Sequence, residues 1–542
     1  MRSLRPLNLY RRVQRMRKWI ALLLSVFLMA GLLAGCTGNN NSGASGNVET
    51  ATGDNGGAAN QSVETGEVID DGSEKLTISF MPESWGGGKW RDDHPTIKYL
   101  NEKFNIEMNV MWTDGPTYKD KLNVMAASGS LPDMYRITSD NFAKWQNEGV
   151  FLDLAPYLDQ YPNLAKAFPE ELWNRLNPQG KIYGFPNWGQ EVRDSYQIRA
   201  DWIRNVGLEM PNEDTFNVDD FYAIMKAFAQ GDPDKNGKND TVGFTTDQEL
   251  GANASQLKAA FGLANEWKME DGKLITVYVQ SEEQKAFLSY LRKMYEEGVL
   301  DPEFYSKKGV NVYEMFQASK AGIFNHHPLG LRMDNKKLKE IDPNAELVQL
   351  APPIGPDGLR GNAAGLLGAN KIVINGKIEP KKRERLLKLL DWWVTDEGTN
   401  IMRNGIEGEH YTKEADGTYK ATPLNDTDLP RIMNNWFFWR ADPNFFIHIW
   451  SPKEEAEFDR KFNENSAKHP WRNESEGLTI YSETFTKSWE SLRLAFLEAQ
   501  LKIIIGREPV DSIDKAIEEW KATGGDKIIQ EVNDAYSKLK GE

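Results

Sequence analysis

The residues that follow position 74 begin with a strand–helix–strand pattern, and this pattern limits the fold more than any other feature. Apolar residues alternate along Lys75–Phe80, recur at helical spacing over residues 94–104, and alternate again over residues 106–112. Alternation predicts half-buried strands, and the longer spacing predicts an amphipathic helix. Two strands joined through a helix form a parallel βαβ unit with a right-handed crossover. The chain is therefore predicted to be an α/β protein.

The N-terminus has the pattern of an export signal. Residues 1–18 contain seven basic and no acidic residues, and an apolar run follows from Trp19 to Leu33. This run is shorter than the about 20 apolar residues that span a bilayer, so residues 1–35 are expected to be a signal peptide. Cys36, the only cysteine of the chain, follows a stretch that resembles the lipobox of bacterial lipoproteins. Cys36 is therefore the expected lipid attachment site, with Met16 as an alternative start of the chain.

Composition separates a tether from a folded part. Residues 36–74 are rich in Gly, Asn and Ser and lack aromatic residues, which is typical of a flexible tether. Residues 75–542 exceed what one hydrophobic core usually holds, so two lobes are expected. The formal charge of −15 disfavours nucleic acid and anionic lipid headgroups as partners. A single cysteine excludes an internal disulfide.

Aromatic residues are numerous, with 17 Trp, 18 Tyr and 24 Phe. The indole N–H needs a hydrogen-bond partner, so Trp is hard to bury completely. Exposed flat rings can stack on the apolar faces of sugars, although core packing explains any single ring equally well. Aromatic residues in loops, beside planar polar groups, are therefore the candidates for sugar contact.

Three segments resemble the extracellular sugar-binding lipoproteins of ABC importers. Residues 125–133, which end in Ser-Gly-Ser-Leu-Pro-Asp, resemble the ASG-x-LPD signature of that family. Residues 404–411 resemble the GIEG-x-HY stretch of its larger Gram-positive members. Residues 503–536 resemble the C-terminal segment of the same subgroup, which includes oligosaccharide- and alginate-binding proteins.

The resemblance implies two α/β lobes of the type II periplasmic-binding-protein-like fold, with a hinge and a ligand cleft between them. Lobe one would hold residues 75–187 and 350–405, and lobe two would hold residues 188–349 and 406–542. The implied function is capture of a carbohydrate, in particular an oligosaccharide, by hinge closure and its delivery to an ABC permease. The implied protein is a monomer, held by lipid alone on the extracellular face of a Gram-positive cell membrane.

Loop aromatics and their polar neighbours give the candidate ligand contacts. They lie in glycine-rich loops, at predicted strand ends, at the expected first crossing between the lobes, or in the GIEG-x-HY stretch. The candidates are Trp85, Trp112, Trp188, Arg193, His326, Tyr411, Trp436, Trp439, Arg440 and Asp442.

Each candidate also has an alternative role in packing or in a turn. Four consecutive aromatic residues, 436–439, cannot all face one core, so some are expected in a cleft. Arg440 and Asp442 either bind sugar hydroxyls or pair with each other. His326 and His327 are adjacent on a predicted strand end, and such neighbours point to opposite sides, which disfavours a shared metal ion.

Residues 232–240 resemble the first nine positions of an EF-hand loop, with oxygen ligands at alternate positions and glycine at the sixth. The twelfth position is Gly243 instead of the bidentate glutamate, which argues against a calcium switch. Related family members carry a structural calcium in a similar loop, and the alternative is a surface turn rich in Asp and Asn. The expected Ca²⁺ ligands are Asp232, Asp234, Asn236, the carbonyl of Lys238, and Asp240.

The sequence contains no pattern of a catalytic site. A phosphate-binding loop, a zinc-binding helix and a thiol nucleophile beyond Cys36 are all absent. An enzyme is therefore not expected. Acidic residues are plentiful, so a surface lipoprotein glycosidase or lyase remains the first alternative. A binder of peptides or of a signalling ligand is the second.

Overall fold

The computed structural model describes most of the chain from residue 70 to residue 540. Within that range, the residues left out are 85–92, 138, 147, 169, 171–172, 174–179, 187–190, 252, 366–370, 429–441, 443, 445–446 and 476. The described residues form one compact unit. None of the helices among the described residues has both the length and the apolar composition of a membrane-spanning segment.

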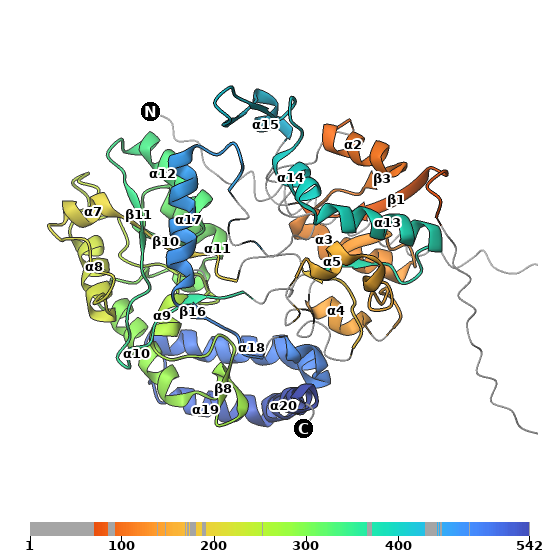
Figure 1. The fold of residues 1–542 in the computed structure, drawn as a ribbon. Helices are drawn as coiled ribbons and strands as arrows, with labels where there is room; N and C mark the ends of the chain where they lie inside the picture. The colour runs from red at the N-terminus through yellow and green to blue at the C-terminus, as the bar shows by residue number, and fades with distance from the viewer. Residues whose placement is uncertain are drawn as a thin grey trace, which may run out of the picture. The chain divides into compact units, whose positions relative to one another are not determined.

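The first sheet contains the predicted βαβ unit (Figure 1). Its strands, in the spatial order β3-β1-β5-β13-β6, are Ile106–Val110, Leu76–Met81, Met134–Ile137, Lys371–Ile374 and Phe185–Pro186. β1 pairs in parallel with β3 through the helix α2 (Pro95–Phe104), while β13 runs antiparallel to both its neighbours. The α/β prediction is confirmed, and residue 371 returns to this sheet within the range predicted for lobe one.

Both faces of the first sheet are covered. Ile372 and Ile374 of β13 pack into one buried cluster, while Val373 packs into another. Helix α13 (Pro380–Trp393) contributes Leu386 to the first cluster. A strand buried on both faces reads as a continuous apolar run, which explains the sequence of β13.

The second sheet has the order β10-β7-β11 and is antiparallel throughout. Its strands are β7 (Ser195–Arg199), β10 (Ile323–His326) and β11 (Leu347–Leu350). Every residue of β7 is buried. The largest hydrophobic cluster of the described residues lies here and includes Trp202, Phe221 and Trp267. The C-terminal helices join the same cluster through Ile503 and Trp520.

The remaining helices form two groups according to their position along the chain. Between and beside the strands of the first sheet lie α3 (Gly115–Ala127), α4 (Ser139–Trp145), α5 (Pro162–Lys166), α14 (Asp396–Asn404) and α15 (Pro423–Asp428). The others are α7 (Ala200–Asn205), α8 (Val218–Gln230), α9 (Ser255–Ala260), α10 (Ser281–Glu296), α11 (Gly309–Gln317), α12 (Pro328–Ile341), α17 (Lys453–Ala467), α18 (Glu483–Ile504), α19 (Ser512–Trp520) and α20 (Asp526–Lys540). The short strands are β2 (Glu83–Ser84), β4 (Thr113–Asp114), β8 (Trp267–Glu270), β9 (Lys273–Thr276), β12 (Asn362–Ala363), β14 (Tyr411–Lys413), β15 (Tyr419–Ala421) and β16 (Pro470–Trp471).

Two segments that connect the sheets run side by side. Val192 forms an isolated bridge with Ala364, and the Gly365 N–H donates to the Glu191 carbonyl at 2.8 Å. β12 extends this contact by pairing in parallel with β16. The resemblance predicted crossings between the lobes near residues 188 and 350, and the position of the hinge stays a prediction. Within residues 406–428, His410 stacks on His94 at the start of α2, and Tyr411 accepts a hydrogen bond from Asn400 of α14. These contacts are with helices next to the first sheet, whereas the prediction assigned residues 406–428 to lobe two. The lobe boundaries stay a prediction.

The folded part begins earlier than the predicted end of the tether at residue 74. Asp70 is buried and accepts two hydrogen bonds from Arg385 of α13, at 2.5 and 2.6 Å. Arg385 also donates to the Phe104 carbonyl at 2.7 Å and the Asn105 carbonyl at 2.9 Å. These hydrogen bonds from Arg385 hold the pKa of Asp70 below its usual range. The start of the folded chain is therefore tied to the first sheet.

Replacing Arg385 with Met is expected to lower the free energy of unfolding by about 3 to 5 kcal/mol, because Asp70 would be left buried without its cation. Urea unfolding followed by tryptophan fluorescence measures this loss. Lys381→Met is the matched control, because the Lys381–Glu74 ion pair is exposed on both sides. Equal midpoints for the two variants would show that the Asp70 contact does not stabilise the fold.

Candidate functional site

Charged residues meet at one edge of the second sheet. The start of β7 and the end of β10 share this edge, because Ser195 pairs with His326. Arg193 donates to both oxygens of Asp194, at 2.8 and 2.7 Å, yet 42% of its side chain stays exposed. Burial opposes ionisation of Asp194, but the charge of Arg193 outweighs it and lowers the pKa of that carboxyl. Arg193 and His326 are thus two predicted ligand contacts that the fold brings to one edge.

The His326 ring is held by a buried carboxylate. Four donors surround Asp334: Nδ1 of His326 at 3.0 Å, Gln197 at 2.9 Å, the Tyr313 hydroxyl at 2.7 Å and Gln317 at 3.1 Å. Burial works against the charged form, but these hydrogen bonds outweigh it and lower the pKa of Asp334. Because Nδ1 donates to a carboxylate, Nε2 of the neutral His326 ring is an acceptor. His326 can therefore offer a fixed acceptor to a hydroxyl group.

The neighbouring His327 has a different role. Its Nδ1 accepts the Gly330 N–H at 3.1 Å and caps α12. Burial is the main cause that lowers the pKa of His327 to about 3. Gly330 has no room for a side chain, because a Cβ there would lie 2.2 Å from Nδ1 of His326. The start of α12 therefore packs directly on the histidine pair.

A hollow of about 270 Å³ lies between α9, β16 and α18. Trp471 of β16 lines it, and its indole N–H donates to the Leu263 carbonyl at 2.8 Å. Asn265 donates to the carbonyls of Trp471 and Ala364, at 2.8 and 3.2 Å. This hollow, here called the α9 pocket, therefore borders the crossing segments. Its charged lining residues are Glu249, Lys258, Glu266 and Arg493.

The other sequence candidates lie apart from these two places or outside the described residues. Trp112 packs against the cluster on the first sheet. Tyr411 is buried, and its hydroxyl accepts a hydrogen bond from Asn400 at 3.0 Å. Asp442 accepts from Arg403 at 2.9 Å. Cys36, Trp85, Trp188, Trp436, Trp439 and Arg440 lie outside the part of the chain that the structure describes.

His410 of the GIEG-x-HY stretch lies in a buried trio with His94 and Asp428. This trio is the candidate metal cluster among the described residues. Nδ1 of His94 accepts the Thr96 N–H at 3.1 Å, and Nδ1 of His410 accepts the Ile406 N–H at 2.9 Å. A neutral imidazole has one N–H, so both rings carry it on Nε2, which faces Asp428. Metal-binding histidines instead donate from the second nitrogen. The Nε2 atoms that face Asp428 therefore carry protons and act as hydrogen-bond donors, so they are not available as metal ligands.

The predicted calcium loop is an exposed turn in which carboxylates gather round Asn236. The Asn236 amide donates to Asp234 at 2.7 Å and to Asp240 at 3.0 Å, and backbone N–H groups donate to Asp232. Burial and then the neighbouring Asp232 and Asp240 raise the pKa of Asp234. A bound divalent cation would relieve this repulsion, so the donor set fits Ca²⁺. Lys320 holds Asp240 at 2.7 Å and partly takes the place of such a cation.

Packing explains why the twelfth position of that loop is glycine. A Cβ on Gly243 would lie 2.1 Å from the Met225 carbonyl oxygen and 2.9 Å from that of Val299. A bidentate glutamate therefore cannot occupy this position without moving α8. The loop has the first nine positions of an EF-hand and lacks the last ligand for a steric reason.

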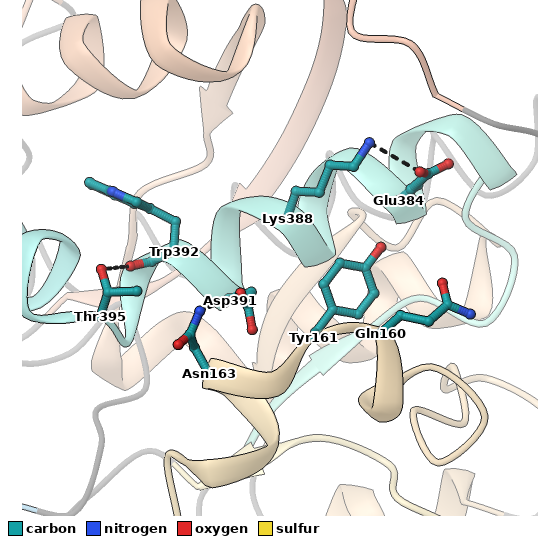
Figure 2. Close-up of a pocket in the computed structure, with 8 residues that line it drawn as sticks. All are labelled: Gln160, Tyr161, Asn163, Glu384, Lys388, Asp391, Trp392 and Thr395. Carbon is teal, nitrogen blue, oxygen red and sulfur yellow. Dashed lines mark hydrogen bonds and ion pairs between the residues drawn. The ribbon is translucent and has the colours of Figure 1, made fainter.

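Another hollow lies beside α13 and is lined by polar groups that largely satisfy one another (Figure 2). Lys388 and Glu384, on successive turns of α13, form an ion pair at 3.0 Å, and Asn163 donates to Asp391 at 2.8 Å. None of the sequence candidates lines it. We therefore do not assign the ligand to this hollow.

Sequence reasoning missed Trp471 and the charged residues of the α9 pocket. Trp471 belongs to a two-residue strand, and β16 has no periodicity that a pattern could detect. Lys258 sits in a six-residue helix and resembles an ordinary surface lysine. The one available signal was the Trp-Arg pair, Trp471 and Arg472, which combines a ring with a planar cation.

Comparisons with known proteins point to one family. The family model described as bacterial extracellular solute-binding protein matches residues 96–407. Lipoprotein LipO of Bacillus subtilis is 28% identical over 98% of this chain and 100% of its own length. The polygalacturonan/rhamnogalacturonan-binding protein YtcQ of the same organism is 27% identical over 96% and 99%.

Solved structures of low identity share the fold. The alginate-binding protein AlgQ2 aligns with a TM-score of 0.65 at 20% identity, over 86% of this chain and 99% of that one. A solute-binding protein of Bifidobacterium longum infantis, described as HMO-binding, aligns with a TM-score of 0.68 at 14% identity over the same shares. The predicted type II periplasmic-binding-protein-like fold is confirmed.

Replacing Asp334 with Asn is expected to lower the free energy of unfolding by about 3 kcal/mol at pH 7, because an amide cannot accept from four donors. The native pKa of Asp334 is lowered, so its contribution is complete above the unfolded value of about 3.9 and is lost as the pH falls through the native value. Urea unfolding at pH 7 and pH 3 should show the difference from wild type shrinking at pH 3. The exposed Asp214→Asn variant is the control, and a pH-independent difference would contradict the assignment.

Proposed function

Because the chain belongs to the family of bacterial extracellular solute-binding proteins, we propose that the solute it captures is a carbohydrate, in particular an oligosaccharide. The observations that carry this proposal are the planar polar groups at one edge of the second sheet and the aromatic ring that lines the α9 pocket next to the crossing segments. Arg193 and His326 offer a donor and an acceptor, and Trp471 offers a ring. The names of relatives support it: YtcQ is described as binding polygalacturonan and rhamnogalacturonan.

The proposed mechanism is capture by hinge closure, followed by delivery to an ABC permease. Arg193 lies next to Val192, whose bridge to Ala364 joins the two crossing segments. A ligand that contacts Arg193 therefore contacts the hinge region directly. Closure would bury the sugar and strengthen its hydrogen bonds by removing water. The remaining sequence candidates, Trp112, Tyr411 and Asp442 together with the aromatics outside the described residues, stay predictions for sugar contact.

The proposed location is the extracellular face of a Gram-positive cell membrane. Residues 1–35 would be removed as a signal peptide, and acyl chains on Cys36 would hold the protein through its tether. Two or more acyl chains are needed for stable anchoring. LipO, similar over its whole length, is itself described as a lipoprotein. The anchored protein would act as a monomer.

We propose that the protein binds the sugar without cleaving it. Glycoside hydrolysis needs two carboxyl groups that flank the scissile bond. In the α9 pocket, Glu249 is held by Arg493 at 3.3 Å, which leaves Glu266 as the other lining carboxylate. A family of solute-binding proteins also favours release of an intact ligand.

The loop at residues 232–240 is proposed to hold a structural Ca²⁺. Asp232, Asp234, Asn236, Asp240 and the carbonyl of Lys238 would supply its oxygen ligands. The ion would brace this turn and take no part in sugar binding. Solved relatives described as AlgQ2 without calcium and as a FusA EF-hand mutant support calcium in this fold.

Adding Ca²⁺ to the chelator-treated protein is expected to raise its melting temperature, because an ion that binds only the folded state stabilises it by about 2.7 kcal/mol at a hundredfold excess over Kd. Differential scanning fluorimetry measures the shift. The double variant Asp232→Asn, Asp234→Asn should lose it, whereas Asp357→Asn, at an exposed turn, should keep it. A shift retained in the double variant would place the ion elsewhere.

At least one oligosaccharide in a broad panel is expected to raise the melting temperature of the protein in a concentration-dependent way. The panel should include fructo-, galacto-, gluco- and manno-oligosaccharides, together with uronic acid oligomers. Chromatography of the recovered sugar should return it intact. Recovery of fragments would favour the glycosidase or lyase, and stabilisation by peptides alone would favour a peptide or signal binder.

A further inference from the structure

Lys258 and Glu266 line the same pocket, and the side chains of both are without a hydrogen bond or ion pair to any residue that the structure describes. Their charges nevertheless influence each other. Burial lowers the pKa of Lys258, which Asp247 and Glu266 partly oppose. The protein atoms around the Glu266 carboxylate raise its pKa, which Lys258 and Arg493 partly oppose. By solvent accessibility Lys258 is half-buried and Glu266 is exposed, so two opposite charges line one pocket without a protein partner among the described residues.

The surrounding charges are already paired, so they do not compete for these two groups. Arg493 contacts Glu249 at 3.3 Å and Glu490 at 2.9 Å. Asp247 accepts the Gly251 N–H at 2.7 Å. Unpaired polar groups that converge on a hollow lined by aromatic rings are the usual mark of a ligand site.

Glu266 is held in place by its backbone. Its φ of +66° is in the left-handed region, which is uncommon for a residue with a side chain. The carbonyl of Glu266 accepts from the Val277 N–H at 2.8 Å and from the Thr276 hydroxyl at 2.9 Å. Local strain of this kind persists where the surroundings fix the conformation, and it is frequent at ligand sites.

We propose that Lys258 and Glu266 together bind hydroxyl groups of a neutral sugar ring of the oligosaccharide, with Trp471 as the apolar surface of the same subsite. This inference rests on the proposed function and adds the charge class of the ligand. A hydroxyl group can accept from the Lys258 ammonium and donate to the Glu266 carboxylate. A uronate would satisfy Lys258 but would be repelled by Glu266, and a cationic amino sugar would meet the reverse conflict.

The test uses the full chain, purified in detergent, with titration calorimetry of a matched pair of ligands. One ligand is a neutral galacto-oligosaccharide, and the other is the uronic acid oligomer of the same length and linkage. Other neutral and acidic pairs from the panel follow in the same way. The wild-type protein should bind the neutral member of a pair more tightly.

Two variants test the pair of charges. Lys258→Met should weaken neutral binding about tenfold or more, because a charge-assisted hydrogen bond is lost. Glu266→Gln should weaken neutral binding to a similar extent but strengthen binding of the acidic ligand, because the repulsion is removed. Lys502→Met, on the exposed face of α18, should leave both affinities within about twofold.

Stability provides a second readout. Neither side chain pairs within the described protein, so both variants should melt at or above the wild-type temperature, and weak binding would not reflect unfolding. If neutral sugars bind and both variants match the control, the inference is wrong while the proposed function stands. If only acidic sugars bind, the inference is likewise overturned and oligosaccharide capture remains. If no sugar binds, the proposed function fails and the inference fails with it.

Discussion

The pairing of β7 with both its neighbours is the constraint on which the candidate site depends. All five residues of β7 are buried, and the strand is antiparallel to β10 on one side and β11 on the other. Side chains alternate along a strand, so a slip of one residue would turn Ile198 away from the core and Gln197 away from Asp334. The register therefore fixes which residues stand at the sheet edge. Arg193 precedes β7 and His326 ends β10, and the packing of an interior strand brings them together.

Charged side chains in this protein are of two kinds, and the difference indicates where a ligand belongs. Arg199 is fully buried, but it donates to Asp201 at 2.8 and 2.6 Å, to Ser319 at 2.7 Å and to Asp342 at 3.0 Å. The Arg199 guanidinium already has its hydrogen-bond partners within the protein, so a ligand would add nothing to its stabilisation. Lys258 is half-buried and Glu266 is exposed, and neither side chain has an equivalent partner among the described residues. A ligand hydroxyl group can accept a hydrogen bond from the first and donate one to the second.

Local patterns predicted the fold better than the site. The periodicity of residues 75–112 is contained in neighbouring residues, and the structure confirms the strand, the helix and the parallel strand there. The α9 pocket depends instead on distant segments, since Asn265 and Trp471 are 206 residues apart and meet through one hydrogen bond. No local pattern shows that Lys258 and Trp471 will line the same pocket. The role of the histidine in the GIEG-x-HY stretch was also not predictable from the sequence. His410 accepts the Ile406 N–H and packs on Gly405, so its role is to stabilise this turn.

Net charge and local charge act at different distances in this protein. The formal charge of −15 gives the chain a negative field that disfavours the approach of polyanions. At physiological ionic strength this field decays over about 8 Å, so it cannot discriminate between ligands that already lie in a pocket. That discrimination depends on the groups in contact. Lys258 and Glu266 carry opposite charges and line one hollow. Hydrogen bonds to the backbone carbonyl of Glu266 fix the position of its main chain. An acidic protein with such a pair therefore selects a ligand that has many hydroxyl groups and no charge.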